Sequence, residues 1–274
     1  MTDFSIEIIT RGEKSLNDSL DSIARQSYNS FEIVCANSSS DPSVAKILNN
    51  HSVRHLEVGP VRHLRGRELA HSLSSGKFCL IMDSTRLLEP NALEVLNIYI
   101  EQYDLVAIRE DSIGEGFWVN QARVYKNISE KNIDSNVIRE KIPSYILPRL
   151  YRNDILTNIF FSLKQKIPDK LFNSIGYGEH HIIFQEALSM TQSFYYYRDN
   201  ALIKHYEDPS LGSIYRKYRN YGMDQIILRD LPDYHASHLS SHSRKLNRSQ
   251  IMGNIICLPL ISVRTISFLV GILL

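Results

Sequence analysis

Strand-like and helix-like segments alternate along the first 110 residues, and this alternation constrains the fold more than any other feature of the sequence. Short apolar runs predict strands at residues 4–9, 31–36, 54–59, 78–82 and 104–109. The intervening segments carry apolar residues at helical spacing or a proline at a helix start, and they predict helices at residues 16–26, 42–48, 62–74 and 90–99. Such an order is typical of an α/β fold with a doubly wound, mostly parallel sheet.

Polar side chains follow several of these predicted strands, at the point where each strand ends. Thr10 and Arg11 follow the first strand, Asn37 and Ser38 the second, and Asp83 the fourth. Ligands of doubly wound sheets bind beyond the carboxyl ends of the strands. These residues are therefore expected on the ligand edge.

The stretch GKFCLIMDSTRLLEP makes Asp83 the most informative of them. Five consecutive apolar residues lead to a single carboxylate, and Ser84, Thr85 and Arg86 follow it. Asp-Ser-Thr after a strand could simply cap a turn or a helix. On a ligand edge, the same carboxylate and Arg86 could instead contact a bound ligand.

Composition narrows the class of protein. The chain has 274 residues, of which 43% are hydrophobic, enough for one large α/β domain or two modest ones. A net charge of +1 gives no reason to expect nucleic acid as a partner. Three scattered cysteines without a CxxC pair, and an N-terminus without a signal-peptide pattern, predict a reduced cytoplasmic compartment.

The C-terminal segment, residues 251–274, is apolar apart from interruptions at Pro259 and Arg264. A spanning helix needs roughly 20 apolar residues, so a tail in the membrane interface or the start of a membrane hairpin fits better than a clean span. Basic residues precede the tail and suit the cytoplasmic face of a membrane, namely Arg244, Lys245 and Arg248. Packing of the tail on the domain or on a partner subunit is the alternative.

Four segments, in this order, resemble the inverting glycosyltransferases of family 2, which have the A-type, Rossmann-like nucleotide-sugar fold. They are SIEIITRGEKSLNDSLDSIARQSYNSFEIVCANSSSD, VRHLRGRELAHSLSSGKFCLIMDSTR, GYGEHHIIFQEAL and IKHYEDPSLGSIYRKYRNYG. The resemblance covers roughly residues 4–222 and implies a hexosyltransferase. Its nucleotide-binding half would be residues 1–110 and its acceptor-binding half residues 111–222. Residues 223–274 would form a helical C-terminal extension.

The resemblance implies a divalent metal site with a departure from the family pattern. Asp83 stands at the first acid of the D-x-D motif, but Thr85 replaces the second acid. His205 stands at the late metal-contacting histidine. Mg²⁺ and Mn²⁺ prefer several oxygen ligands, so a single carboxylate predicts weak metal binding.

The resemblance also implies the catalytic base and the donor-binding residues. Glu179 and His180 occupy the family's Glu-Asp pair, and either could be the base; a helix N-terminus that favours an acid is the structural alternative. The acidic nucleotide-binding position aligns with Ala36 or Asn37, and neither is acidic. The residues expected to bind the nucleotide or its phosphates are Thr10, Arg11, Asn37, Ser38, Arg62, Ser84 and Arg86.

Two functions follow from these patterns. The first is transfer of a sugar from a nucleotide-diphosphate sugar to a lipid-linked or glycan acceptor at a membrane. The second, suggested by the missing acid, is a binding or scaffold module of the same fold without transfer activity. A nucleotidyltransferase is disfavoured because no glycine-rich phosphate loop lies near the N-terminus.

Overall fold

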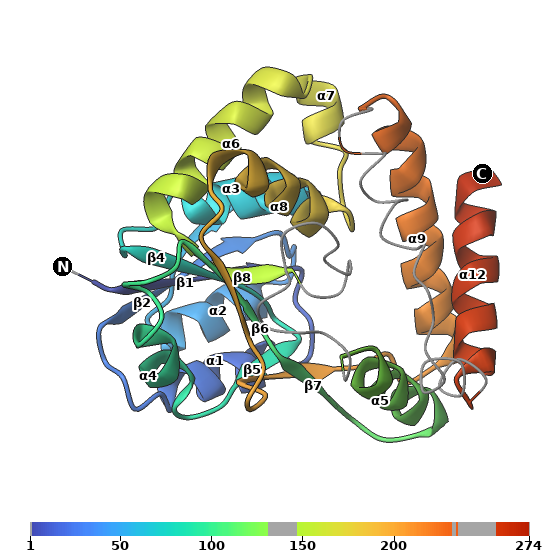
Figure 1. Cartoon of the computed structure of the whole chain (residues 1–274), viewed down its shortest axis with the longest axis horizontal. Coiled ribbons are helices and arrows are strands. Elements are labelled where there is room, and N and C mark those ends of the chain that lie inside the picture. Colours follow the sequence, from blue (N-terminus) through green and yellow to red (C-terminus); the bar gives the residue numbers. More distant parts are fainter. Residues whose placement is uncertain (1, 131–146, 232–233, 235–255, 274) are drawn as a thin grey trace.

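The computed structural model describes residues 2–130, 147–231, 234 and 256–273, and a seven-stranded sheet forms its centre (Figure 1). From one edge to the other the strands are β3 (Arg54–Glu57), β2 (Phe31–Asn37), β1 (Phe4–Thr10), β4 (Phe78–Asp83), β8 (Pro148–Arg152), β6 (Leu105–Ile108) and β9 (Phe194–Tyr197). All neighbouring pairs are parallel except those of β8, which runs antiparallel to β4 and β6. The predicted mostly parallel α/β sheet is therefore confirmed.

Helices cover both faces of this sheet, and β4 shows why the strands are continuously apolar. Leu80 and Met82 pack on one face with α1 (Leu16–Ala24), α2 (Pro42–Asn50) and α4 (Ala92–Asn97). Cys79 and Ile81 pack on the other, where the helices are α3 (His63–His71), α6 (Asn153–Lys166), α7 (Asp169–Phe172) and α8 (Glu179–Met190). Successive strand residues point to opposite faces, so a strand buried on both faces needs apolar residues at every position.

A second, three-stranded sheet has the order β5 (Arg86–Leu88), β10 (Ile203–Tyr206), β7 (Glu110–Ile113). The glycines and partial alternation of residues 110–126 would suggest a hairpin or a mobile loop, but the structure has neither there. The segment forms β7, which pairs with the distant β10, and then α5 (Phe117–Glu130). Gly114 and Gly116 have φ angles of 117° and 105°, so the glycines that suggested a loop make the turn between strand and helix.

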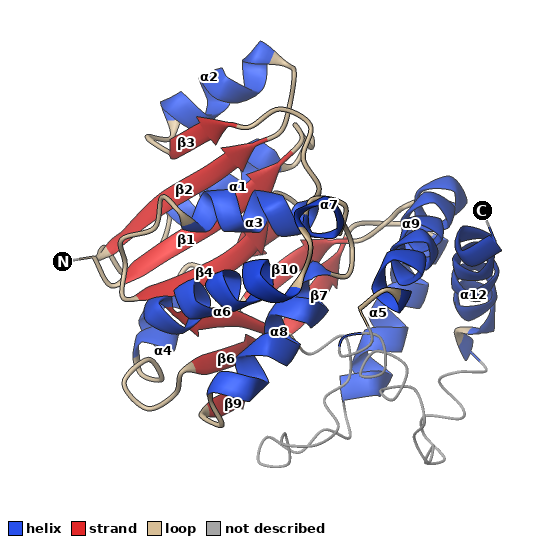
Figure 2. Cartoon of the chain, turned by 90° about the horizontal axis from the view of Figure 1, so that it is seen from above, coloured by secondary structure: helices blue, strands red, loops and turns tan. Residues whose placement is uncertain are grey.

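Two long helices lie side by side beyond the end of the sheet (Figure 2). α9 (Leu211–Arg229) continues past the domain boundary expected at residue 222. α12 (Leu258–Leu273) packs along α9 at two glycines, where a Cβ on Gly222 would lie 2.0 Å from the Phe268 carbonyl oxygen.

Within the apolar tail, Leu258–Leu273 form a single helix that runs through both Pro259 and Arg264. Pro259 stands in the first turn of α12, where proline is tolerated. Arg264 turns inward, and its guanidinium lies 4.9 Å from the ring centre of Tyr218. Within the described residues, no helix is long and apolar enough to cross a membrane. The predicted basic flank, Arg244, Lys245 and Arg248, lies outside those residues.

Candidate functional site

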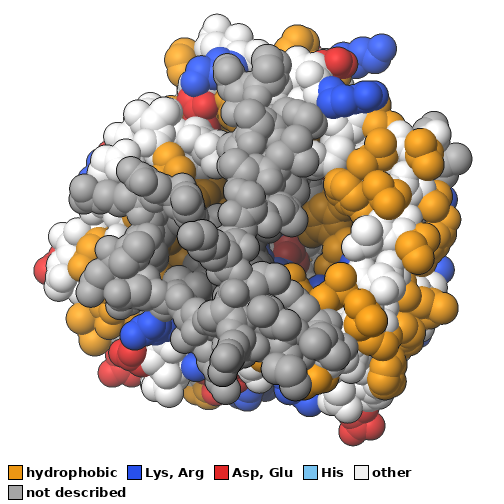
Figure 3. All heavy atoms as spheres, turned by 45° about the vertical axis from the view of Figure 1, so that its right-hand side comes forward, with side chains coloured by type: hydrophobic (Ala, Val, Ile, Leu, Met, Phe, Trp, Pro, Cys, Tyr) orange, Lys and Arg blue, Asp and Glu red, His pale blue; other side chains and the backbone are white. Residues whose placement is uncertain are grey.

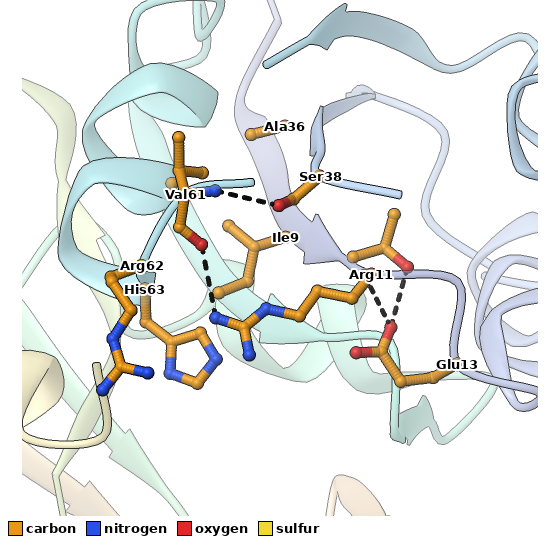
Figure 4. Close-up of a pocket in the computed structure, with 10 residues that line it drawn as sticks. Ile9, Arg11, Glu13, Ala36, Ser38, Val61, Arg62 and His63 are labelled. Carbon is orange, nitrogen blue, oxygen red and sulfur yellow. Dashed lines mark hydrogen bonds between the residues drawn. The ribbon is translucent and has the colours of Figure 1, made fainter. Parts of the chain in front are cut away.

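A pocket opens at the carboxyl ends of β1 and β2 (Figure 4), where the sequence predicted the ligand edge. Its volume is ≈ 270 Å³ with the open mouth included. Four of the predicted nucleotide-binding residues line it: Thr10, Arg11, Ser38 and Arg62. The other lining residues are Ile9, Glu13, Ala36, Val61, His63 and Gly66.

Glu13, which the sequence analysis had not singled out, organises one side of the pocket. Its Oε2 accepts hydrogen bonds from Thr10 Oγ1 at 2.8 Å, from the Arg11 backbone N–H at 3.0 Å and from Ser84 Oγ at 2.5 Å. Burial raises the pKa of Glu13, but these hydrogen bonds outweigh burial and hold the pKa below its ordinary value. The predicted residues Thr10 and Ser84 therefore position a carboxylate rather than point freely into the pocket.

Ala36 near the end of β2 and Ser38 just after it line the pocket, while Asn37 between them does not. The Asn37 amide donates to both carboxylate oxygens of Glu57, at 3.0 and 2.9 Å. Ser38 Oγ accepts from the Val61 backbone N–H at 3.1 Å. Successive residues of a strand point to opposite sides, so Ala36 and Asn37 do not both face the pocket. The residue that faces the pocket is Ala36, which carries no polar group.

Two arginines lie at the pocket rim, and they differ in how firmly they are held. The exposed Arg11 extends across the pocket and donates from Nη2 to the Val61 carbonyl oxygen at 3.2 Å (Figure 4). Arg62 Nη2 pairs with Asp224 Oδ1 at 2.9 Å. Asp224 also accepts from the backbone N–H groups of residues 176–178, directly before α8. Arg11 is therefore the rim arginine free to turn toward a ligand.

Next to the pocket, the fold brings Asp83 together with Glu179 and His180. Asp83 ends β4, and the other two are the first residues of α8. One ligand atom from each lies within 4.8 Å of the others, an arrangement that could hold a metal ion. The predicted metal ligand and the predicted base pair thus share one site.

Arg67 of α3, which the sequence analysis missed, stands among these three residues. Its Nη2 contacts Asp83 Oδ1, lies 3.2 Å from His180 Nε2 and lies 3.5 Å from Glu179 Oε1. The side chain is 0% exposed, and burial lowers its pKa to about 10, so it remains charged at neutral pH. Its spacing from the buried Leu64 placed it on the core-facing stripe of the helix, which was the available signal.

Two further arginines and a glutamate complete the cluster. Arg86 pairs with the second carboxylate oxygen of Asp83 and lies 2.9 Å from Glu110 Oε1. Arg149 lies 3.0 Å from the same Glu110 oxygen and 2.6 Å from His180 Nε2. Burial raises the pKa of Glu110, but Arg86 and Arg149 outweigh it and hold the pKa well below the ordinary value. Burial first, and then the arginines, lower the pKa of His180 well below its ordinary value, so its imidazole is neutral.

His205, the second predicted metal ligand, belongs to a neighbouring group instead. It lies on β10 opposite Arg86, and its Nδ1 is 3.2 Å from Glu207 Oε1. Burial, reinforced by Arg86, lowers the pKa of His205 to about 4. Within the described chain, the metal-capable group that contains Asp83 does not include His205.

Comparison with known proteins shows the family to which the chain belongs. The sequence profile of glycosyl transferase family 2 matches residues 5–160, more than half of the chain. The chain belongs to glycosyl transferase family 2. The resemblance seen in the sequence motifs is thereby confirmed. No curated protein sequence matches the chain.

Solved structures show the A-type fold of this family 2 chain at low sequence identity. S. aureus TarS has a TM-score of 0.57 and 18% identity, over 96% of this chain and 49% of that one. A TarS 1–349 complex with UDP-GlcNAc has a TM-score of 0.54 and 17% identity, over 96% and 81% of the two chains. The mannosyltransferase PcManGT from Pyrobaculum calidifontis, in complex with GDP-Man and Mn²⁺, has a TM-score of 0.56 and 12% identity, over 98% and 85%. This family 2 chain thus spans about half the length of full TarS.

Proposed function

We propose that this chain transfers a sugar from a nucleotide-diphosphate sugar, with inversion, to a lipid-linked or glycan acceptor. The observation that carries the proposal is the adjacency of two features at the carboxyl edge of the sheet. One is the pocket rimmed by Arg11 and Arg62, and the other is the cluster of Asp83, Glu179 and His180. Family membership and the nucleotide-sugar complexes of the structural neighbours support the same donor class.

In this proposal the nucleoside lies in the pocket and the diphosphate lies toward Arg11. Departure of a diphosphate builds up negative charge, which preorganised cations stabilise. Arg11 is exposed and Arg86 lies beside Asp83, so both guanidiniums are close to the path of the leaving group.

A hydroxyl acceptor must also lose its proton to a base. The neutral imidazole of His180 has the required protonation state, but Arg149 Nη1 lies 2.6 Å from its Nε2. Glu179 is the first residue of α8, and its carboxylate lies 3.5 Å from Arg67 Nη2. Both remain candidates for the base. An anionic phosphate acceptor needs neither.

Metal assistance, which the family resemblance implies, does not fit the arrangement of these side chains. Asp83, Glu179 and His180 offer a possible site, but a guanidinium nitrogen of Arg67 already contacts all three. A cation at the centre of the group would displace that nitrogen or lie against its charge. The positive charge of the proposed transfer is therefore assigned to side chains of the chain.

We also propose that α12 lies on the cytoplasmic face of a membrane, near a lipid-linked acceptor. Several polar and small residues of α12 face α9 and α5, while its outer face is mostly apolar (Figure 3), with Ser262 and Thr265 as exposed polar residues. The inward residues are Arg264, Ser267 and Gly271, and the exposed ones include Leu258, Ile266, Leu269 and Leu273. Small residues inward and apolar residues outward are typical of helices that face lipid.

Vesicle flotation tests this placement. Wild type should float with anionic phospholipid vesicles, and the double variant Ile266→Asn, Leu269→Asn should float less. Ser262→Asn, on an already polar exposed position, is the matched control. Equal flotation of all three proteins would contradict the placement, and a dimer that dissociates in the double variant would assign the face to a second copy.

Calorimetric titration with UDP-, GDP- and dTDP-linked sugars tests the donor proposal. We expect one nucleotide class to bind, and Arg11→Ala to weaken its binding roughly tenfold, since a hydrogen bond to a charged group contributes about 1.5–3 kcal/mol. Arg25→Ala, an exposed arginine away from the pocket, should bind as wild type does. Absence of binding by every donor would refute the proposal.

A binding module without transfer activity is the second candidate. Thr85 in place of the second acid favours it, as does the pairing of Asp83 with two arginines. Mass-spectrometric detection of glycosylated lipid or glycan acceptors separates the two functions. Donor binding without any product or donor hydrolysis would select the binding module.

A further inference from the structure

Arg67 contacts Asp83, Glu179 and His180 together. One nitrogen, Nη2, makes all three contacts, with His180 Nε2 at 3.2 Å and Glu179 Oε1 at 3.5 Å. A divalent ion bound by these three side chains would need the same central position. The guanidinium therefore already provides positive charge where such an ion would provide it.

The fold holds this guanidinium in place from several sides. Nη1 of Arg67 donates to the Met82 backbone carbonyl oxygen, one residue before Asp83 in β4. Gly66, beside it in α3, lets the helix approach β1, since a Cβ there would lie 3.3 Å from an Ile9 methyl group. Arg67 is fully buried, so the side chain cannot swing into solvent to vacate the position without opening the core.

The ligand set also lacks what a divalent ion would require. Thr85 replaces the second acid of the motif, and Arg86 takes the second oxygen of Asp83. Across the whole cluster three guanidiniums face three carboxylates, from Arg67, Arg86 and Arg149 and from Asp83, Glu110 and Glu179. A divalent ion added to this balanced cluster would leave two uncompensated charges in a poorly solvated site.

We propose that Arg67 replaces the divalent cation in this chain, so that donor binding is independent of metal. This inference rests on the proposed donor-binding function. Arg67 is a positioning residue, because it acts by neutralising Asp83 and Glu179 and by orienting His180. The donor diphosphate, entering beside the partly exposed Asp83, meets fixed guanidiniums instead of a metal ion.

The first experiment needs no variant. UDP, GDP and the corresponding nucleotide sugars are titrated into the full chain in EDTA, and again in MnCl₂ and in MgCl₂. The expected result is an unchanged dissociation constant, within about twofold. A tenfold or greater weakening in EDTA that Mn²⁺ restores would overturn the proposal.

The second experiment asks whether removal of the guanidinium creates a metal site. In Arg67→Met the three ligand side chains lose their central cation, and electron paramagnetic resonance should detect Mn²⁺ bound by the variant but not by wild type. Arg67→Lys keeps a positive charge and should resemble wild type. Arg65→Met, on the same helix but partly exposed and paired with Glu68, is the matched control.

The Mn²⁺ measurement also separates this inference from the proposed function. If no donor binds under any condition, the donor proposal fails, while Mn²⁺ binding still decides the role of Arg67. Equal Mn²⁺ affinity of wild type and Arg67→Met would overturn the role of Arg67, whatever the donor result. If Arg67→Met does not fold, Arg67→Lys still tests the inference. The lysine variant keeps a positive charge between the three side chains, so Mn²⁺ binding by this variant would contradict the proposed role of Arg67.

Discussion

Replacing Asp224 by asparagine tests whether α9 anchors the loop that leads into α8. The Asp224 side chain is 1% exposed. Its Oδ2 accepts from the backbone N–H groups of residues 176–178, at 3.0 Å from the first and 3.3 Å from the last. Its Oδ1 pairs with Arg62 Nη2 at 2.9 Å. Since Glu179 follows this loop directly, the carboxylate positions the start of α8 from a distant helix.

The expected loss of stability follows from these contacts. Asparagine can keep its Oδ1 toward the three backbone N–H groups, so those contacts remain without the carboxylate charge, while its NH₂ group, a donor, replaces the oxygen that accepted from Arg62. A hydrogen bond to a charged group contributes roughly 1 kcal/mol more than a neutral one, so we expect the free energy of unfolding to fall by about 3 kcal/mol. The pair with Arg62 adds little, because the Arg62 side chain is 37% exposed and solvent screens it. For a chain of this size the melting temperature should fall by roughly 6 to 12 °C.

Urea denaturation and calorimetry measure the loss, and hydrogen exchange locates it. Amide exchange should accelerate first in residues 174–182, because that segment loses its anchor. Asp230→Asn, at the exposed C-terminal end of the same helix, is the matched control and should leave stability unchanged. A free energy of unfolding for Asp224→Asn within 0.5 kcal/mol of that control, on the scale of ordinary surface substitutions, would refute the reasoning.

Three further predictions concern other parts of the molecule. Gly222→Ala should destabilise the chain by about 1–3 kcal/mol and expose α12 to proteolysis, because its Cβ would overlap the Phe268 carbonyl, whereas Gly212→Ala has room and should not. Burial raises the pKa of Glu186, but hydrogen bonds from a lysine, a serine and a tyrosine outweigh it and hold the pKa below its ordinary value. Its stabilisation is therefore present above about pH 4.5 and lost as pH falls through the folded-state pKa, so the melting temperature of Glu186→Gln should fall less than that of wild type on acidification. Ser84→Ala removes one hydrogen bond of the pocket and should weaken donor binding roughly fivefold, a cost of about 1 kcal/mol, by calorimetry; unchanged affinity would show that this contact does not shape the pocket.

Much of the parallel half of the fold could be read from the sequence, because local periodicity encodes it. Apolar runs such as residues 78–82 are strands buried on both faces, and their carboxyl ends define the ligand edge. Sequence periodicity did not predict the antiparallel strand β8 or the pairing of β7 with β10. Partners far apart in the chain leave no periodic signal, and the glycines at 114 and 116 resembled those of a loop.

The residues of the candidate site likewise include some that sequence patterns indicated and some that they did not. Asp83, Glu179 and Arg11 could be named from strand ends and family motifs, and the structure places the first two in one cluster and the third in the pocket beside it. Glu13 and Arg67 were missed, because their importance lies in the partners that surround them. The sequence signal for Arg67 was its spacing from Leu64 on the core-facing stripe of α3.

The sequence by itself determined that a mostly parallel sheet presents polar groups along one edge, since strand-like and helix-like segments alternate and polar residues follow the strands. Tertiary structure alone decided what those groups do. It turned Asn37 away from the pocket, drew Arg264 inward against Tyr218, and placed the buried charge of Arg67 among Asp83 and its neighbours. The physical reason is that the role of a charge depends on the distance, burial and sign of its partners, and the fold sets all of these.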